Sequence, residues 1–167
     1  TTTDFPMNNG QGYYDLAIAA SHTNADGVIV GTQTTYRSMD GGKTFSAVGG
    51  YAGPFPIHPD LQDVKCNGKE TWIATDGGGV LRMQGDSKVL YSVKNGLAAD
   101  VVFSLREDNS GAIWIGTNSW LTRIKNDRLT SIRAKDGLPN ENVYQIVSDG
   151  RGTIWIGSAV GIFCVDE

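Results

Sequence analysis

The chain has 167 residues with 22 glycines, and only 19% of its residues are charged, which is typical of a turn-rich β protein rather than a helical one. The net charge of −4 argues against nucleic acid or an anionic membrane surface as a partner. No apolar run approaches the roughly 18 residues of a membrane-spanning helix, so we expect no membrane insertion. The two cysteines show neither metal-ligand spacing nor a disulfide framework.

The first quarter of the chain contains short apolar segments separated by turns. After a β-prone start and a loop, residues 14–19, 28–32 and 35–38 are predicted strands, because β-branched and aromatic residues alternate between polar turns. The motif Ser38-Met-Asp-Gly-Gly-Lys-Thr-Phe45 follows. In it, Asp40 is placed to hydrogen-bond the backbone of its own turn, and Gly42 to take a left-handed conformation.

This motif resembles the Asp-box of bacterial neuraminidase repeat propellers, and the resemblance extends over residues 1–85. The family positions are Ser38, Asp40, Gly42, Thr44 and Phe45. The resemblance implies that the box is a fold-stabilising hairpin remote from any active centre. We therefore interpret these five residues as structural.

The second quarter begins with a proline-rich loop. Residues 51–60 contain three of the five prolines and have no periodicity, which predicts a rigid extended connection. The segments 61–66, 71–75, 80–83 and 89–93 follow as predicted strands.

From residue 95 onward, one order of motifs occurs twice. Asn95-Gly-Leu97 and Asp136-Gly-Leu-Pro139 each precede a strand, an Asp-x-x-Gly turn and a Trp-Ile-Gly strand. This order resembles the two-component regulator propeller repeat. The resemblance implies the extracytoplasmic sensor half of a hybrid histidine kinase, notably of glycan-scavenging Bacteroidetes, and a periplasmic or extracellular location. Residues 1–85 fit this repeat poorly, so the chain combines features of two propeller families, as a natural sequence or as an engineered chimera.

One strand recurs in each quarter and ends at a hydroxyl residue. The copies end at Thr32, Thr75, Thr117 and Ser158, at intervals of 43, 42 and 41 residues. A period of about 40 to 50 residues built on short apolar strands is typical of β-propeller blades. We predict an all-β propeller in a single domain, with Trp72, Trp114 and Trp155 in its core. The four predicted blades cover about residues 14–50, 57–94, 99–135 and 141–167.

Ring closure depends on the chain ends. The fourth blade stops before an outer strand, whereas the third continues through residues 128–133. We predict that residues 1–5 supply the missing strand and remove the exposed edge. A four-bladed monomer and an eight-bladed homodimer both stay open.

The candidate binding residues lie in loops at one end of the blades. Loops that enter the inner strands and loops that follow the Trp-Ile-Gly strands share this end, because propeller strands run from the centre outward. Aromatic rings mixed with amides and carboxylates favour an oligosaccharide, which stacks on rings and hydrogen-bonds through hydroxyls. Trp120 is the strongest single candidate for ligand binding, because the equivalent turns contain small residues and do not need a large ring. The alternative explanation for this ring is packing against a neighbouring blade or chain. The predicted ligand-binding residues are Tyr13, Tyr36, His58, Asp76, Asp100, Trp120 and Asn140.

Enzymatic chemistry has less support. The Asp-box suggests a sialidase, but the arginines, the Tyr-Glu pair and the acid that sialidase chemistry requires are not recognisable in the sequence. Asp60 and Asp100 are an example of a possible glycosidase pair, but acidic residues are common in propeller turns, so their spacing alone does not support this activity. His22 and His58 lack neighbouring metal ligands, and the sequence has no calcium or phosphate loop. We predict no catalytic residue, metal or cofactor. The function is then either a sensor-like propeller that binds a glycan or a scaffold that contacts protein, including another copy of itself.

Overall fold

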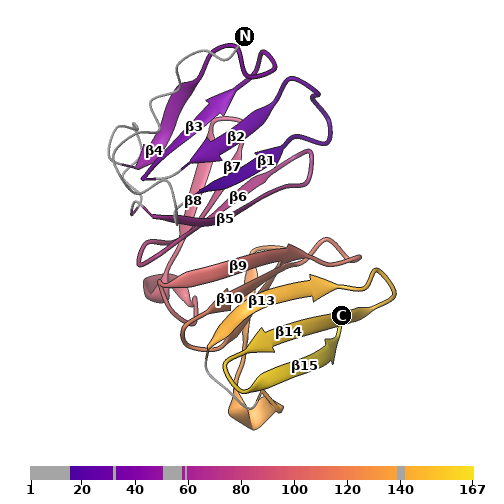
Figure 1. Cartoon of the computed structure of the whole chain (residues 1–167). Coiled ribbons are helices and arrows are strands. Elements are labelled where there is room, and N and C mark those ends of the chain that lie inside the picture. The colour runs from indigo at the N-terminus through magenta and orange to yellow at the C-terminus, as the bar shows by residue number, and fades with distance from the viewer. Residues whose placement is uncertain (1–15, 32, 51–57, 59, 139–141) are drawn as a thin grey trace.

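The computed structural model describes residues 16–31, 33–50, 58, 60–138 and 142–167. Four antiparallel sheets follow one another along the chain, and within each sheet consecutive strands pair as a meander (Figure 1). The all-β fold with four blades per chain is therefore confirmed. The prediction that residues 1–5 complete the last blade lies outside the described residues.

Each blade begins with its inner strand. Blade 1 comprises β1 (Ala17–Ala20), β2 (Val28–Gly31), β3 (Thr34–Ser38) and β4 (Ser46–Gly50). Blade 2 comprises β5 (Leu61–Cys66), β6 (Thr71–Thr75), β7 (Gly79–Gln84) and β8 (Ser87–Tyr91). Blade 3 comprises β9 (Val102–Glu107), β10 (Ile113–Thr117), β11 (Leu121–Lys125) and β12 (Arg128–Ile132). Blade 4 comprises β13 (Val143–Ser148), β14 (Thr153–Ser158) and β15 (Gly161–Asp166), and the 3-10 turns η1 (Val93–Asn95) and η2 (Ala134–Asp136) follow blades 2 and 3.

The blades stack face to face, with β1, β5, β9 and β13 side by side in that order. We call the face that packs on the following blade the front face. Because side chains alternate along a strand, Trp72 and Trp114 point forward while Ile73 and Ile115 point back. The second strand of each middle blade is thus buried on both sides, which explains its continuous apolar sequence.

Glycine near the end of the second strand allows the inner strand of the next blade to approach it. A Cβ atom on Gly116 would lie 2.6 Å from the backbone oxygen of Val143 in the next blade, and one on Gly31 would lie 2.6 Å from the side chain of Leu61. A side chain at either position would force the two blades apart.

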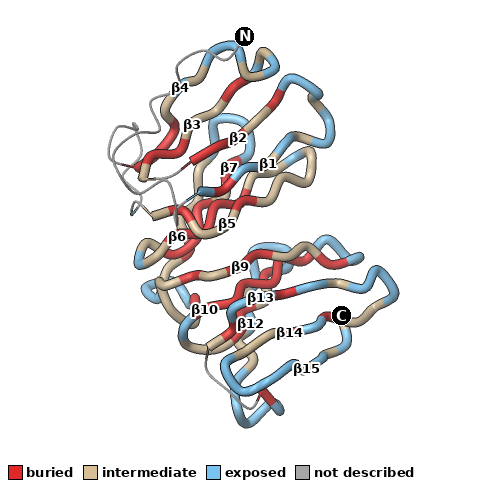
Figure 2. Tube along the Cα trace, viewed as in Figure 1, coloured by how far each residue is buried: buried red, intermediate tan, exposed pale blue. Residues whose placement is uncertain are grey.

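The described blades form an open arc. No contact like those between consecutive inner strands joins β13 to β1. The prediction of a core position for Trp155 is wrong: it is 45% exposed, against 2% for Trp72 and Trp114. Trp155 lies on the front face of blade 4 with Val147 and Ile162, which are also exposed. Much of β15 is accordingly drawn as exposed in Figure 2. No described blade packs on that face.

The Ser38–Phe45 turn connects β3 to β4 through side-chain hydrogen bonds. The Asp40 carboxylate accepts from the backbone N–H of Lys43 (3.0 Å) and Thr44 (2.9 Å) and from the Thr44 hydroxyl (2.6 Å). Ser38 donates its hydroxyl to Asp40 at 2.8 Å and accepts from the Gly42 N–H at 2.9 Å. Hydrogen bonds from Thr44 and Ser38 lower the pKa of Asp40 to about 2.

Candidate functional site

The hydroxyl residue that closes each repeat shapes the turn after it. In blades 2, 3 and 4 this side chain donates to a backbone carbonyl three or four residues later and accepts an N–H from within the same turn. The hydroxyl-to-carbonyl pairs are Thr75 to Gly79 at 3.0 Å, Thr117 to Trp120 at 2.8 Å and Ser158 to Gly161 at 3.2 Å. The repeated Thr or Ser therefore positions the loop between the second and third strands.

Trp120 occupies a backbone position that blades 2 and 4 give to glycine. Its φ is +85°, compared with +78° for Gly79 and +145° for Gly161. A left-handed conformation costs a residue with a Cβ atom about 1–2 kcal/mol. The Trp120 side chain is half-buried and packs against the hydrophobic cluster between blades 3 and 4. Packing thus explains the burial of part of the Trp120 ring, and the left-handed backbone conformation holds the ring at the end of the blades.

Backbone hydrogen bonds join the loops at this end from blade to blade. Asp76 donates its N–H to the Asp60 carbonyl at 3.0 Å within blade 2. Gly77 donates to the carbonyl of Asp100, at the entrance to blade 3, at 3.0 Å. Asn118 then donates to the carbonyl of Val101 at 3.1 Å. The loops that carry Asp76, Asp100 and Trp120 are therefore one connected surface, which we call the loop end.

The other predicted binding residues divide into three groups. His58 is exposed and lies against the Gly77–Gly78 turn, so it belongs to the loop end. Tyr36 does not, because it lies inside β3 opposite Val30 and therefore points to the face of blade 1 that is turned away from blade 2. Tyr13 and Asn140 lie outside the described residues. The carboxylate of Asp100 accepts the Val93 N–H at 2.8 Å, which gives it a structural role as well.

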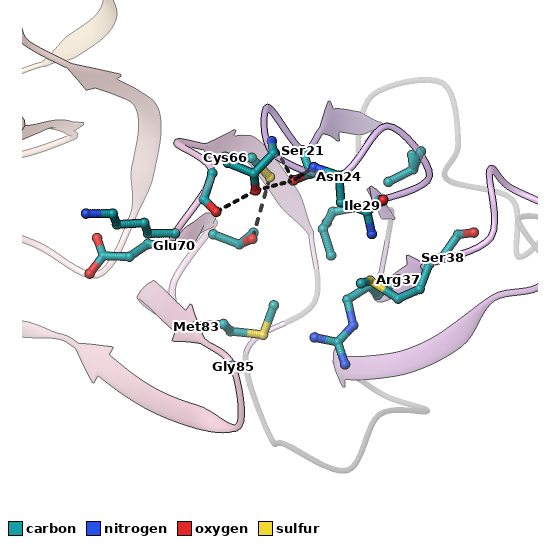
Figure 3. Close-up of a pocket in the computed structure, with 16 residues that line it drawn as sticks. Ser21, Asn24, Ile29, Arg37, Ser38, Cys66, Glu70, Met83 and Gly85 are labelled. Atoms are coloured by element: carbon teal, nitrogen blue, oxygen red, sulfur yellow. Dashed lines mark hydrogen bonds between the residues drawn. The ribbon is translucent and has the colours of Figure 1, made fainter.

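Two cavities among the described residues lie at the opposite end of the blades, and the sequence analysis did not predict them. A cavity of about 240 Å³ opens between blades 1 and 2, lined by the β1–β2 and β5–β6 turns (Figure 3). A second, of about 290 Å³, lies between blades 2 and 3 and is lined by Glu70, Trp72, Arg82 and Asp127 among others. The sequence feature that could have indicated these cavities is an arginine at the same place in the third strand of blades 1, 2 and 3, namely Arg37, Arg82 and Arg123.

In blade 2 this arginine is fully engaged. The Arg82 guanidinium lies 5.5 Å from the Trp72 ring and forms an ion pair with Asp127 of blade 3. Asp127 also accepts from the Tyr91 hydroxyl at 3.0 Å, and burial together with this bond raises the pKa of Tyr91 to about 12. The charged side chains of the second cavity, Glu70, Arg82 and Asp127, are thus paired with neighbouring groups.

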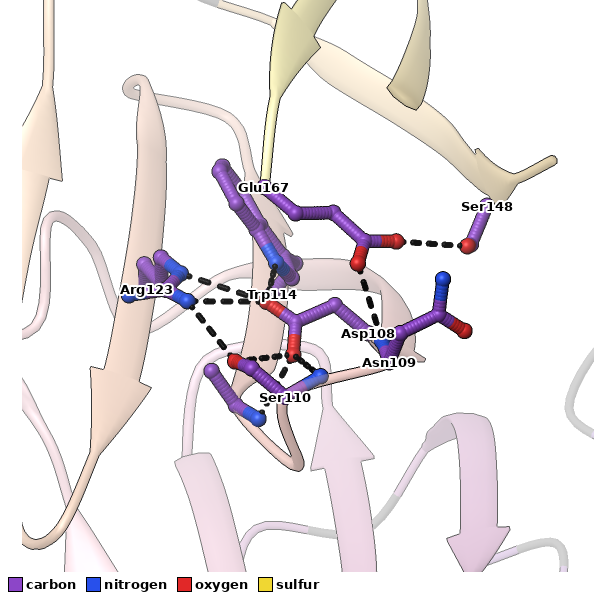
Figure 4. A network of polar contacts seen from close by, with 8 residues as sticks. Asp108, Asn109, Ser110, Trp114, Arg123, Ser148 and Glu167 are labelled. Atoms are coloured by element: carbon purple, nitrogen blue, oxygen red, sulfur yellow. Dashed lines mark hydrogen bonds and ion pairs between the residues drawn. The ribbon is translucent and has the colours of Figure 1, made fainter. Parts of the chain in front are cut away.

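In blade 3 the arginine belongs to a network around Asp108 (Figure 4). Arg123 lies 5.3 Å from the Trp114 ring and donates to Asp108 at 2.9 Å. Burial would raise the pKa of Asp108, but hydrogen bonds led by those from Ser110 and Trp114 lower it to about 2. Glu167 accepts from the Ser148 hydroxyl and the Asn109 N–H, so the last residue ties blade 4 to this turn. This network is structural.

Within the described residues, no three His, Cys, Asp or Glu side chains converge in a way that could hold a metal ion. In that same part of the chain, no helix has the length and apolar character needed to cross a membrane.

Comparison with known proteins supports the fold. The family model of the two component regulator propeller matches residues 96–119 and 137–159. Comparison with curated proteins gives no match. An extracellular domain assigned to a hybrid two component system of B. thetaiotaomicron superposes with a TM-score of 0.74 at 16% identity, over 92% of this chain and 23% of that chain.

Two other solved structures share the fold. A GH74 xyloglucanase from Xanthomonas campestris gives a TM-score of 0.61 at 18% identity, over 92% of this chain and 24% of that chain. YCF48 from Cyanidioschyzon merolae gives 0.62 at 14% identity, over 95% of this chain and 55% of that chain. The chain therefore spans between about a quarter and about half of the length of these structures. It is a β-propeller protein with four blades per chain, and two stretches in its second half match the regulator propeller repeat.

Proposed function

We propose that the chain is a non-enzymatic, sensor-type propeller that binds an oligosaccharide at the loop end. The observation that carries this proposal is Trp120, a large aromatic residue at φ +85° where the equivalent turns of blades 2 and 4 have glycine. Backbone strain of this kind is retained where the side chain serves a purpose. The regulator propeller repeats and the extracellular two-component domain among the similar structures agree with a sensor role and with a periplasmic or extracellular location.

The surroundings of Trp120 suit a sugar. An indole ring stacks on the apolar face of a pyranose, and the His58 ring lies at the same end of the blades. Asp76 and Asp100, both half-buried there, add carboxylate oxygens as acceptors for hydroxyl groups. We further propose that the Ser38–Phe45 turn is an Asp-box hairpin without a binding role, because it connects β3 to β4 at the opposite end.

The test compares two substitutions of the same residue. A glycan array identifies the best oligosaccharide, and calorimetry then measures its Kd, which we expect in the micromolar to millimolar range. Trp120→Ala and Trp120→Gly should both abolish binding, while Trp120→Gly should unfold at a higher temperature than Trp120→Ala because glycine relieves the strain. Lys125→Ala and Arg128→Ala, at the opposite end, are the controls. Wild-type affinity in either Trp120 variant, or no glycan bound by the parent, would refute the proposal.

The exposed front face of blade 4 favours a second candidate function, a scaffold that contacts protein. Such a scaffold would bind no glycan and would lose its partner when Trp155 is replaced, with Trp120→Ala harmless. Hydrolysis is tested separately by incubating the protein with xyloglucan, and we expect no new reducing ends.

A further inference from the structure

We infer that the cavity between blades 1 and 2 is a binding site for a small organic carboxylate, with Arg37 as its anchoring cation. This site lies at the opposite end of the blades from Trp120, and it is independent of the function proposed above.

The argument begins with the register of the repeats. Arg37 pairs across the strands with Ile29, as Arg82 does with Trp72 and Arg123 with Trp114. The three arginines therefore hold equivalent places on the front faces of blades 1, 2 and 3.

The partners of these arginines differ between blades. Arg82 has a carboxylate from Asp127 and lies 3.9 Å from Glu70, and Arg123 has the carboxylate of Asp108. In blade 1, the place two residues before Ile29 is Gly27, where blade 2 has Glu70 before Trp72. Within the described chain, the side chain of Arg37 forms no hydrogen bond or ion pair. Its guanidinium projects into the cavity opposite Met83 (Figure 3).

The cavity is bounded by groups that are already satisfied. The Ser21 hydroxyl accepts the N–H groups of Thr23 and Asn24, and the Thr23 hydroxyl donates to the Gly68 carbonyl at 2.7 Å. The last bond joins blade 1 to blade 2 across the cavity, so the space does not depend on a ligand to form. Arg37 is thus the cationic group that stays available at the wall, with the exposed Lys69 nearby.

The chemistry of the walls selects the ligand. A guanidinium can bind a carboxylate through two parallel, charge-assisted hydrogen bonds. In the next two blades, the carboxylates of Asp127 and Asp108 pair with the equivalent arginines. The apolar wall consists of Ile29, Met39 and Met83, which suits a short aliphatic body. Glu70, the acidic residue on this lining, already accepts the Trp72 indole N–H at 3.0 Å. A volume of about 240 Å³ accommodates a ligand of a few carbon atoms.

The experiment uses 4-methylpentanoate and its uncharged amide, 4-methylpentanamide, as matched probes. Titrations are followed by the ¹³C-methyl NMR signals of Met39 and Met83. The acid should shift both signals saturably with a millimolar Kd, and the amide should bind about tenfold to a hundredfold more weakly, because it loses the charge-assisted bonds. This comparison uses the parent protein, so it does not depend on the folding of a variant.

Two variants locate the site. Arg37→Gln should weaken the acid to the level of the amide, and Arg128→Gln, an exposed arginine in blade 3, should bind as the parent does. The inference would be overturned if acid and amide caused equal shifts, or if Arg37→Gln bound the acid with unchanged affinity. It would also be overturned if the acid caused no saturable shift at a ligand concentration 50-fold above a Kd of about 1 mM.

Discussion

The indole N–H of Trp114 donates a 2.8 Å hydrogen bond to Asp108, whose side chain has no exposed surface. The same carboxylate accepts from the backbone N–H groups of Ser110 and Ala112 and from Arg123 of β11. One buried anion therefore joins the turn before β10 to both of the strands that follow it.

Removing this anion should be costly. We expect Asp108→Ala to lower the free energy of unfolding by about 3 kcal/mol, because Arg123 and several N–H donors lose a buried partner. Asp149→Ala is the matched control. Asp149 is equivalent in blade 4, but its hydrogen bonds are to the exposed backbone of Arg151 and Thr153. Urea unfolding measures both, and equal losses would contradict the central role of Asp108.

Stability should depend on pH in the acid range. The pKa of Asp108 is about 2 in the folded protein, against an ordinary value of 3.8. The unfolded chain therefore takes up the proton first, and stability is lost as the pH falls from about 4 to about 2. Asp40, whose pKa is also about 2, acts in the same direction. Urea midpoints should be nearly constant above pH 5, and Asp108→Asn should flatten the acid decline. If Asp108→Asn lost stability in acid as steeply as the parent does, groups other than Asp108 would be responsible for the acid dependence.

The turn hydroxyls should contribute measurably. Thr117 is fully buried, and its hydroxyl bonds to Ser119 N–H and Trp120 carbonyl. Thr117→Val keeps the shape but leaves the Ser119 N–H unpaired and removes one of the two hydrogen bonds that the Trp120 carbonyl accepts, so we expect a loss of about 1–2 kcal/mol in thermal or urea unfolding. Thr117→Ser should retain most of the stability, and Thr130→Val on exposed β12 should have little effect. A neutral Thr117→Val would show that the hydroxyl does not hold the turn.

The front face of blade 4 should make the protein self-associate. Trp155 and Ile162 expose apolar surface at positions whose equivalents in blades 2 and 3 are buried, and Val147 is exposed beside them. Sedimentation velocity should show mass rising with concentration, and Trp155→Arg or Ile162→Asp should shift the protein toward monomer. Val160→Asp, which removes an exposed apolar side chain in the adjacent turn, is the control. Association that Val160→Asp reduces equally would exclude the face as its cause.

The sequence by itself determined the number of blades and the position of most strands. The four copies of one apolar strand, at intervals of 43, 42 and 41 residues, require one repeating unit, and the Thr or Ser at its end is explained by a hydrogen bond within four residues. The loop end was also predictable in outline, since His58, Asp76, Asp100 and Trp120 follow from the direction of the strands. These features depend on local contacts, which a sequence pattern records.

Only the tertiary structure decided which residues of different blades meet. The ion pair between Arg82 and Asp127 joins side chains 45 residues apart, and only the packing of blade 3 on blade 2 brings these two side chains together. Trp155 has the same neighbours in sequence as Trp114, yet it is exposed because a front face is buried only where another blade packs on it. The sequence predicts Tyr36 at the loop end, but its pairing with Val30 turns the side chain to the face of blade 1 that points away from blade 2. Burial and ion pairing at these places arise from the stacking of whole sheets.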